Sequence, residues 1–167
     1  MPVTLPDAEE LCAALADAMR PQIDPGRTAL VGIHTGGAWV AERLHKVLGL
    51  KVPAAAIDVS FYRDDYNQRG LRASSHTSQI PFDVEAAHIV IVDDVLYTGR
   101  TIRAAMNEIF DYGRPARVDL AVMADRGGRE LPVAPTWCPH ELSLPAAQML
   151  ELRRDGDGRL SFRLTEK

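Results

Sequence analysis

Residues 89–103 read Ile-Val-Ile-Val-Asp-Asp-Val-Leu-Tyr-Thr-Gly-Arg-Thr-Ile-Arg, and this stretch decides the fold. Its first four residues form a short, apolar, β-branched run, which is typical of a strand buried on both faces. Two carboxylates, Asp93 and Asp94, follow the run, and a Thr-Gly-Arg-Thr loop then opens a helical pattern. The order of strand, acidic pair, loop and helix predicts an α/β fold with the acidic pair at the ligand-binding edge of the sheet.

The residue types in this stretch suit a sugar phosphate. Unpaired backbone N–H groups at a helix N-terminus bind phosphate, and the hydroxyls of Thr98 and Thr101 add further donors. Asp93 and Asp94 suit ribose hydroxyls or a Mg²⁺ ion, which takes oxygen ligands and keeps several waters. We therefore expect one segment to hold a sugar phosphate at both of its ends.

A second strand, glycine turn and helix precede this stretch. Residues 28–33 form another apolar run, followed by His-Thr-Gly-Gly and then an apolar helical pattern over residues 38–48. The paired glycines, Gly36 and Gly37, let the backbone approach a ligand closely. Two such units in one chain favour a parallel sheet with ligand-binding turns at its carboxyl edge.

The rest of the chain supplies further elements and two irregular segments. An amphipathic helix and two more buried strands are predicted, at residues 7–20, 52–59 and 118–124. Residues 66–81 hold almost no apolar side chain, and a long polar stretch inside a compact domain is usually functional or mobile. Two runs of alternating character flank Asp155-Gly156-Asp157-Gly158 near the end of the chain, which predicts a terminal β-hairpin.

Length and composition limit the possible classes of protein. A chain of 167 residues favours one domain, residues 1–167, and the net charge of −4 gives no general reason to expect nucleic acid binding. Cys12 and Cys138 form no CxxC pattern, which favours reduced thiols in the cytoplasm. No apolar run reaches about 18 residues and the N-terminus does not read as a signal peptide, so we expect a cytoplasmic protein without a membrane span.

Residues 92–101 resemble the phosphoribosyl-pyrophosphate (PRPP) loop of type I phosphoribosyltransferases, and the form Val-Asp-Asp-Val-Leu-Tyr-Thr-Gly-Arg-Thr is similar to that of the PyrR family. Ser-Phe-Tyr-Arg-Asp-Asp at 60–65 and Asp-Arg-Gly-Gly-Arg-Glu-Leu-Pro at 125–132 carry the same resemblance. It implies a type I phosphoribosyltransferase fold, with a mostly parallel sheet of about five strands flanked by helices. It also implies a small hood over about residues 125–147 and a flexible catalytic loop over about 66–81.

The implied activity is uracil phosphoribosyltransferase: uracil and PRPP give UMP and pyrophosphate, with Mg²⁺, in pyrimidine salvage. The family pairs this activity with regulation of pyrimidine operons, so UMP-responsive regulation belongs to the same expectation. The resemblance also implies a homo-oligomer, either a dimer or a tetramer.

The resemblance assigns a role to each part of the site. Asp93 and Asp94 would grip the ribose hydroxyls directly or through Mg²⁺, and Arg69 and Arg72 of the flexible loop would meet the pyrophosphate. The 5′-phosphate would lie on residues 95–101, which are Val95, Leu96, Tyr97, Thr98, Gly99, Arg100 and Thr101. The pyrophosphate turn would be Thr35, Gly36 and Gly37, although PyrR proteins often carry Arg where Gly36 stands.

The base would lie near the segment after residue 124, with Arg63 from the Ser-Phe-Tyr-Arg-Asp-Asp segment at 60–65. The residues expected there are Asp125, Arg126, Arg129 and Leu142. Purine phosphoribosyltransferases usually carry a carboxylate three residues after the acidic pair, where this chain has Tyr97, so we expect a pyrimidine substrate. Gly128 replaces a His that is common in PyrR proteins.

Two other classes of function compete with the enzyme. An RNA-binding attenuation regulator with little or no enzyme activity would need a basic face. The first helix is acidic and apolar, and the arginines are scattered, so this regulator ranks second to the enzyme. The expected partners of the enzyme are PRPP, uracil and UMP, and the partner of the regulator would be a leader RNA. A signalling receiver domain would need a Lys at the end of a later strand, and none of the three lysines is so placed.

Overall fold

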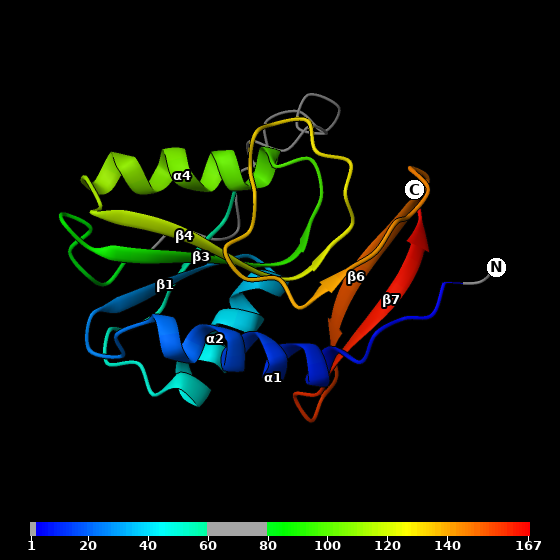
Figure 1. Ribbon diagram of the computed structural model, residues 1–167, viewed down its shortest axis with the longest axis horizontal. Helices are drawn as coiled ribbons and strands as arrows, with labels where there is room; N and C mark the ends of the chain where they lie inside the picture. The colour runs from blue at the N-terminus through cyan, green and yellow to red at the C-terminus, as the bar shows by residue number, and fades with distance from the viewer. Residues whose placement is uncertain (1–2, 60–79) are drawn as a thin grey trace.

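A five-stranded parallel sheet forms the centre of the protein, a computed structural model that describes residues 3–59 and 80–167 (Figure 1). The strand order is β2-β1-β3-β4-β5, and each pair of neighbours runs parallel. The strands are β1 (Thr28–Ile33), β2 (Ala55–Ile57), β3 (His88–Leu96), β4 (Arg117–Asp125) and β5 (His140–Glu141). This confirms the predicted fold class.

Helices cover both faces of the sheet. Helices α1 (Ala8–Met19) and α2 (Gly36–Leu48) lie on one face, and α4 (Arg100–Tyr112) lies on the other (Figure 1). A short 3₁₀ helix, η1 (Arg20–Gln22), follows α1. Apolar residues that alternate along β1 and β3 therefore enter two separate cores, one beneath α1 and α2 and one beneath α4.

Local sequence signals explain where the helices begin and end. Asp7 caps α1, because its Oδ1 accepts the backbone N–H groups of Glu9 at 2.9 Å and Glu10 at 3.3 Å. Gly49 ends α2 in the left-handed conformation with φ 64°. Helix α2 also packs very closely on β1, since a β-carbon at Gly32 would lie 2.7 Å from the Cα of Ala38.

The predicted antiparallel hairpin is present at the end of the chain. It consists of β6 (Gln148–Arg154) and β7 (Leu160–Glu166), which pair in register from Gln148 with Glu166 to Arg154 with Leu160. Leu150, Leu152 and Phe162 join the core beneath α1 and α2. The hairpin thus packs beside this helical layer and stands next to the carboxyl edge of the sheet (Figure 1).

Three predicted boundaries were wrong. The helix expected from residue 38 begins at Gly36, so both glycines of the turn lie in its first turn. The strand expected to end at Val92 continues to Leu96 because β4 pairs with it that far, and the carboxylate pair therefore lies inside β3. The strand expected over 52–59 is limited to Ala55–Ile57. In addition, β5 lies within the irregular segment and extends the sheet beyond β4.

Neither of the two ranges that the structure describes contains a helix with the length and apolar character required to cross a lipid bilayer.

Candidate active site

The two carboxylates of β3 are held by the backbone of the same strand. Asp93 is buried, and its Oδ1 accepts the N–H of Asp94 at 2.9 Å. Asp94 Oδ1 accepts the N–H of Val95 at 2.8 Å. These bonds fix the orientation of both side chains before any ligand arrives.

The turn between β1 and α2 packs directly against this carboxylate pair. A β-carbon at Gly36 would overlap Oδ2 of Asp94, and a β-carbon at Gly37 would overlap the carbonyl oxygen of Val92. The peptide bond between His34 and Thr35 is cis. Both glycines are therefore required for the turn to lie this close to β3.

The loop between β3 and α4 presents the helix N-terminus. Gly99 precedes α4 with φ 96°, a conformation that favours glycine, and Thr98 Oγ1 accepts the N–H of Arg100 at 3.2 Å. The carbonyl oxygen of Thr98 accepts the N–H groups of Glu130 and Leu131. Arg100 Nε lies 3.0 Å from Glu130 Oε1. The segment after β4 therefore supports the loop from one side.

Tyr97 is the first residue of this loop, and its ring contacts the segment that follows β4. The guanidinium carbon of Arg126 lies 3.9 Å from the centre of the Tyr97 ring, a cation–π arrangement. A β-carbon at Gly128, whose φ is 75°, would overlap Cε1 of the same ring. The ring thus occupies a slot that requires glycine at position 128.

Arg126 and Arg129 both bond to the protein's own backbone. Arg126 is buried and donates from Nη1 to the carbonyl of Gln148 at 2.7 Å and from Nη2 to that of Pro145 at 3.1 Å, while its buried Nε has no partner. Arg129 donates from Nε to Val133, from Nη1 to the Tyr97 carbonyl and from Nη2 to Asp125. Every nitrogen of the Arg129 guanidinium is therefore engaged, whereas Arg126 retains one donor.

Asp125 titrates below the usual range for an aspartate. Burial raises its pKa, but the hydrogen bonds from Arg129 and from the N–H of Gly127 outweigh burial and lower the pKa overall. The carboxylate is thus ionised and bound to Arg129 at 2.6 Å. This ion pair braces the turn at residues 125–129.

A cavity of about 530 Å³ lies where these segments meet. It brings together the following residues expected at the site: Thr35, Asp93, Asp94, Val95, Tyr97, Thr101 and Arg126. Gly36 and Gly37 pack against β3 at Asp94 and Asp93 but do not line the cavity, and Leu96 is buried in the core beneath α4. Leu142 packs on the edge of the core beneath α1 and α2. Arg63, Arg69 and Arg72 lie outside the described residues.

The sequence did not point to the remaining lining residues. These are His34, Trp39, Asp58 and the β6 residues Met149, Leu150, Glu151, Leu152 and Arg153. Asp58 directly follows β2 and is therefore at a strand end, which is a sequence signal for a site residue. The signal was missed because the strand was predicted to continue to residue 59. The alternation of residues 148–154 predicts a strand but gives no sign that this strand forms a wall of the cavity.

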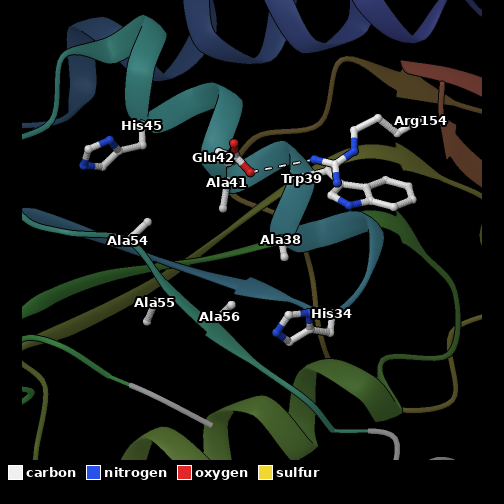
Figure 2. A pocket seen from close by; sticks show the side chains of 10 residues that line it. All are labelled: His34, Ala38, Trp39, Ala41, Glu42, His45, Ala54, Ala55, Ala56 and Arg154. Carbon is white, nitrogen blue, oxygen red and sulfur yellow. Dashed lines mark ion pairs between the residues drawn. The ribbon is translucent and has the colours of Figure 1, made fainter. Parts of the chain in front are cut away.

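A second cavity, of about 430 Å³, lies between α2 and β2 (Figure 2). It shares His34 and Trp39 with the first, and Ala54, Ala55 and Ala56 form part of its lining. At its rim the Arg154 guanidinium lies over the Trp39 ring, 4.8 Å from its centre, with Glu42 Oε2 at 3.8 Å from Nη1. None of the residues expected at the site from the sequence lines this second cavity.

Comparisons with known proteins place this chain in a family. The model of the phosphoribosyl transferase domain matches residues 4–138. The chain is 47% identical over 155 residues to the bifunctional protein PyrR of Ralstonia nicotianae, covering 91% of this chain and 88% of that protein. It is also 47% identical over 153 residues to the bifunctional protein PyrR of Pseudomonas aeruginosa, covering 90% of each.

Solved structures show the same fold. A purine phosphoribosyltransferase from Pyrococcus horikoshii superposes with a TM-score of 0.61 at 28% identity, over 80% of this chain and 81% of that one. A hypoxanthine phosphoribosyltransferase from Staphylococcus aureus superposes with a TM-score of 0.65 at 18% identity, over 87% and 78% of the two chains. The second likeness concerns the fold alone.

Proposed function

The chain belongs to the phosphoribosyl transferase domain family and, within it, to the PyrR proteins, and we propose from this membership that it converts uracil and PRPP to UMP and pyrophosphate. The observation that carries the proposal is the meeting of three segments at one cavity. The carboxylates of Asp93 and Asp94 lie between the glycine turn at residues 35–37 and the N-terminus of α4. PRPP has three matching parts: a ribose, a pyrophosphate and a 5′-phosphate.

The carboxylate pair would act on the ribose. Glycosyl transfer passes through a cationic, oxocarbenium-like sugar, and fixed negative charge beside the ring stabilises that state. Because the N–H groups of Asp94 and Val95 fix the two carboxylates, little reorganisation is required during the reaction. Holding C1′ in line between the uracil nitrogen and the leaving pyrophosphate lowers the barrier by roughly 7–11 kcal/mol in well-oriented cases.

Asp93 and Asp94 would also hold Mg²⁺, since carboxylate oxygens are its preferred protein ligands. Across residues 3–59 and 80–167, no group of three or more His, Cys, Asp or Glu side chains converges as a metal cage. Two carboxylates fit an ion that is completed by water and substrate oxygens. When bound, Mg²⁺ neutralises charge on the leaving pyrophosphate.

The 5′-phosphate would bind at the N-terminus of α4. The backbone N–H groups of the first turn have no partner within the helix, and the helix dipole favours an anion there. Thr98 and Thr101 add hydroxyls, and Arg100 begins the helix. Arg69 and Arg72 remain proposed pyrophosphate contacts from the segment outside the described residues.

The base would lie against Tyr97 and Arg126. Arg126 keeps a buried Nε–H without a partner, which can donate to a uracil carbonyl, whereas the Arg129 nitrogens are all engaged. Tyr97 occupies the sequence position, three residues after the acidic pair, where purine enzymes usually carry a carboxylate, which supports a pyrimidine. Asp125 and Arg129 would position this loop, and Leu142 and Arg63 remain proposed base contacts.

The test is an assay with uracil, PRPP and Mg²⁺ that follows UMP and pyrophosphate. We expect uracil-dependent turnover in the native chain, loss of turnover in Asp93→Asn/Asp94→Asn, and native turnover in the exposed control Asp111→Asn. Hypoxanthine in place of uracil should give no product. Turnover that survives in the double variant, or that prefers hypoxanthine, would exclude the proposed activity.

Regulation of pyrimidine genes is the second candidate function, because the relatives carry the name bifunctional protein PyrR. We propose a homo-oligomer that binds a leader RNA in response to UMP. Glu9 and Glu10 make the start of α1 acidic, so the basic face would have to form elsewhere in the assembly. RNA binding that falls steeply with salt and responds to UMP would support this role. RNA binding that is absent or independent of salt would contradict this role and leave enzyme activity as the sole proposed function.

A further inference from the structure

The glycine turn beside the carboxylate pair supplies no positive charge. Its residues Thr35, Gly36 and Gly37 are neutral, and the carboxylate of Asp94 fills the space where a side chain at position 36 would begin. Pyrophosphate carries several negative charges, and a buried or half-buried anion requires a cation or hydrogen-bond donors nearby. A basic side chain from another element is therefore expected at this end of the cavity.

Two arginines line the cavity among the residues that the structure describes, Arg126 and Arg153. Arg126 is buried, stacks on Tyr97 and donates to two backbone carbonyls, so it is fixed at the other end of β6. Arg153 is different, because half of its side chain is exposed and its Nη2 lies 3.0 Å from Glu151 Oε2, a buried oxygen that accepts no hydrogen bond. A half-exposed ion pair without a hydrogen bond is weak, and a competing anion can replace the carboxylate.

The neighbouring residue places Arg153 near the glycine turn. Arg154 stacks on Trp39, which lies three residues after Gly36 in α2 (Figure 2). Arg153 and Arg154 line different cavities, Arg153 the first and Arg154 the second. Arg154 anchors this end of β6 to α2, while Arg153 lines the cavity that also contains Thr35 and Asp94.

We propose that Arg153 binds the pyrophosphate group of PRPP. When the substrate enters, the Arg153 guanidinium breaks its ion pair with Glu151 and binds phosphate oxygens instead. This inference rests on the proposed phosphoribosyl transfer. It adds a residue from the terminal hairpin, which lies beyond residues 4–138 matched by the family model. Glu151 is then a competitor for Arg153, and its removal should favour the substrate.

The test measures binding by calorimetry with PRPP and Mg²⁺, with pyrophosphate and Mg²⁺, and with UMP. Loss of a charge-assisted hydrogen bond in Arg153→Gln should weaken PRPP and pyrophosphate binding about tenfold to a hundredfold. UMP contains no pyrophosphate, so its affinity should stay within about twofold. Glu151→Gln should act in the opposite direction and tighten PRPP binding by roughly twofold to fivefold, the strength of an exposed ion pair.

Arg159→Gln is the matched control, because Arg159 lies in the same hairpin, is exposed and does not line the cavity. Its PRPP affinity should equal that of the native chain, and Arg153→Lys should recover part of the lost affinity. Native PRPP affinity in Arg153→Gln, or an equal loss of UMP and PRPP affinity, would overturn the inference while leaving the enzyme intact. Failure of the native chain to bind PRPP would instead overturn the proposed function.

Discussion

The Cα of Gly36 packs against the carboxylate of Asp94 so closely that a β-carbon at position 36 would overlap Oδ2 of Asp94. The conformation of one expected site residue therefore depends on the absence of a side chain at another. An arginine at this position, which is frequent in the family, would require a different orientation of Asp94. The two positions form a steric pair whose coupling can be measured.

Gly36→Ala should destabilise the protein by about 1–3 kcal/mol, the usual cost of forcing atoms into a filled space. It should also weaken binding of PRPP and Mg²⁺, because Asp94 must move. In an Asp94→Ala background the two overlapping carboxylate atoms are absent and only a tight 3.3 Å contact with the β-carbon of residue 94 remains, so Ala in the first turn of α2 should cost much less and can be neutral relative to Gly. Urea denaturation of the four proteins measures the coupling, and an equal cost in both backgrounds would contradict it.

Gly128→Ala should destabilise the protein for two separable reasons. A residue other than glycine at φ 75° costs about 1–2 kcal/mol, and the new methyl group would also displace the Tyr97 ring from Arg126. In a Tyr97→Ala background only the backbone cost should remain. The free energy of unfolding of both variants and the double variant checks this, and strict additivity would show that the ring does not occupy the slot.

Asp119→Asn should lower stability by about 2–3 kcal/mol at pH 7, because the buried carboxylate serves several donors. Burial raises the pKa of Asp119, but hydrogen bonds from Arg117, His88 and Thr136 outweigh burial and lower it overall. A carboxyl with a lowered pKa stabilises the fold above its unfolded pKa, and this contribution disappears as pH falls through the folded pKa.

The stability difference between the native chain and Asp119→Asn should therefore shrink below about pH 4, near the unfolded pKa of an aspartate. Urea denaturation at pH 7 and pH 3 makes the comparison, with the exposed Asp157→Asn as the control variant. A difference that is the same at both pH values would show that the ionised carboxylate does not contribute.

Cys12 should resist alkylation in the folded protein. Burial raises the pKa of its thiol to about 11, with Arg43 opposing and Glu9 adding to the shift. Little thiolate forms at pH 8, and the side chain is inaccessible. Iodoacetamide at pH 8 should modify the half-buried Cys138 first and Cys12 only after unfolding in urea, as mass spectrometry of the peptides will show. Early labelling of Cys12 would contradict its burial.

Apolar runs and glycine turns were sufficient to predict four of the five strands of the central sheet, but not β5. β1 follows from a continuous apolar run, all of which is buried, and α4 follows from buried residues that recur with a helical period. The start of α2 was wrong because glycine has a low helix propensity, yet tertiary packing against β3 holds Gly36 and Gly37 in the first turn. The end of β3 was wrong because pairing with β4 extends the strand past the carboxylates.

The walls of the site depend on contacts between distant segments, which local patterns do not encode. The hydrogen bonds of Arg126 to Pro145 and Gln148 join the end of β4 to the start of β6. Arg43 joins α1 to the hairpin turn, bonding to Glu9 and to the carbonyl of Gly158. These bonds help bring Glu151 and Arg153 to the cavity that Asp94 also lines, although more than 50 residues separate them from Asp94 in the chain.

The position of Trp39 makes it an intrinsic fluorescent probe of both cavities. The chain has two tryptophans, and Trp137 is buried and donates its indole N–H to Gln22 at 3.2 Å, so its emission should change little with ligand. Trp39 borders both cavities, beneath the Arg154 guanidinium. Events at either cavity therefore alter the surroundings of one indole, and fluorescence titration with a Trp137→Phe variant can follow them without a label.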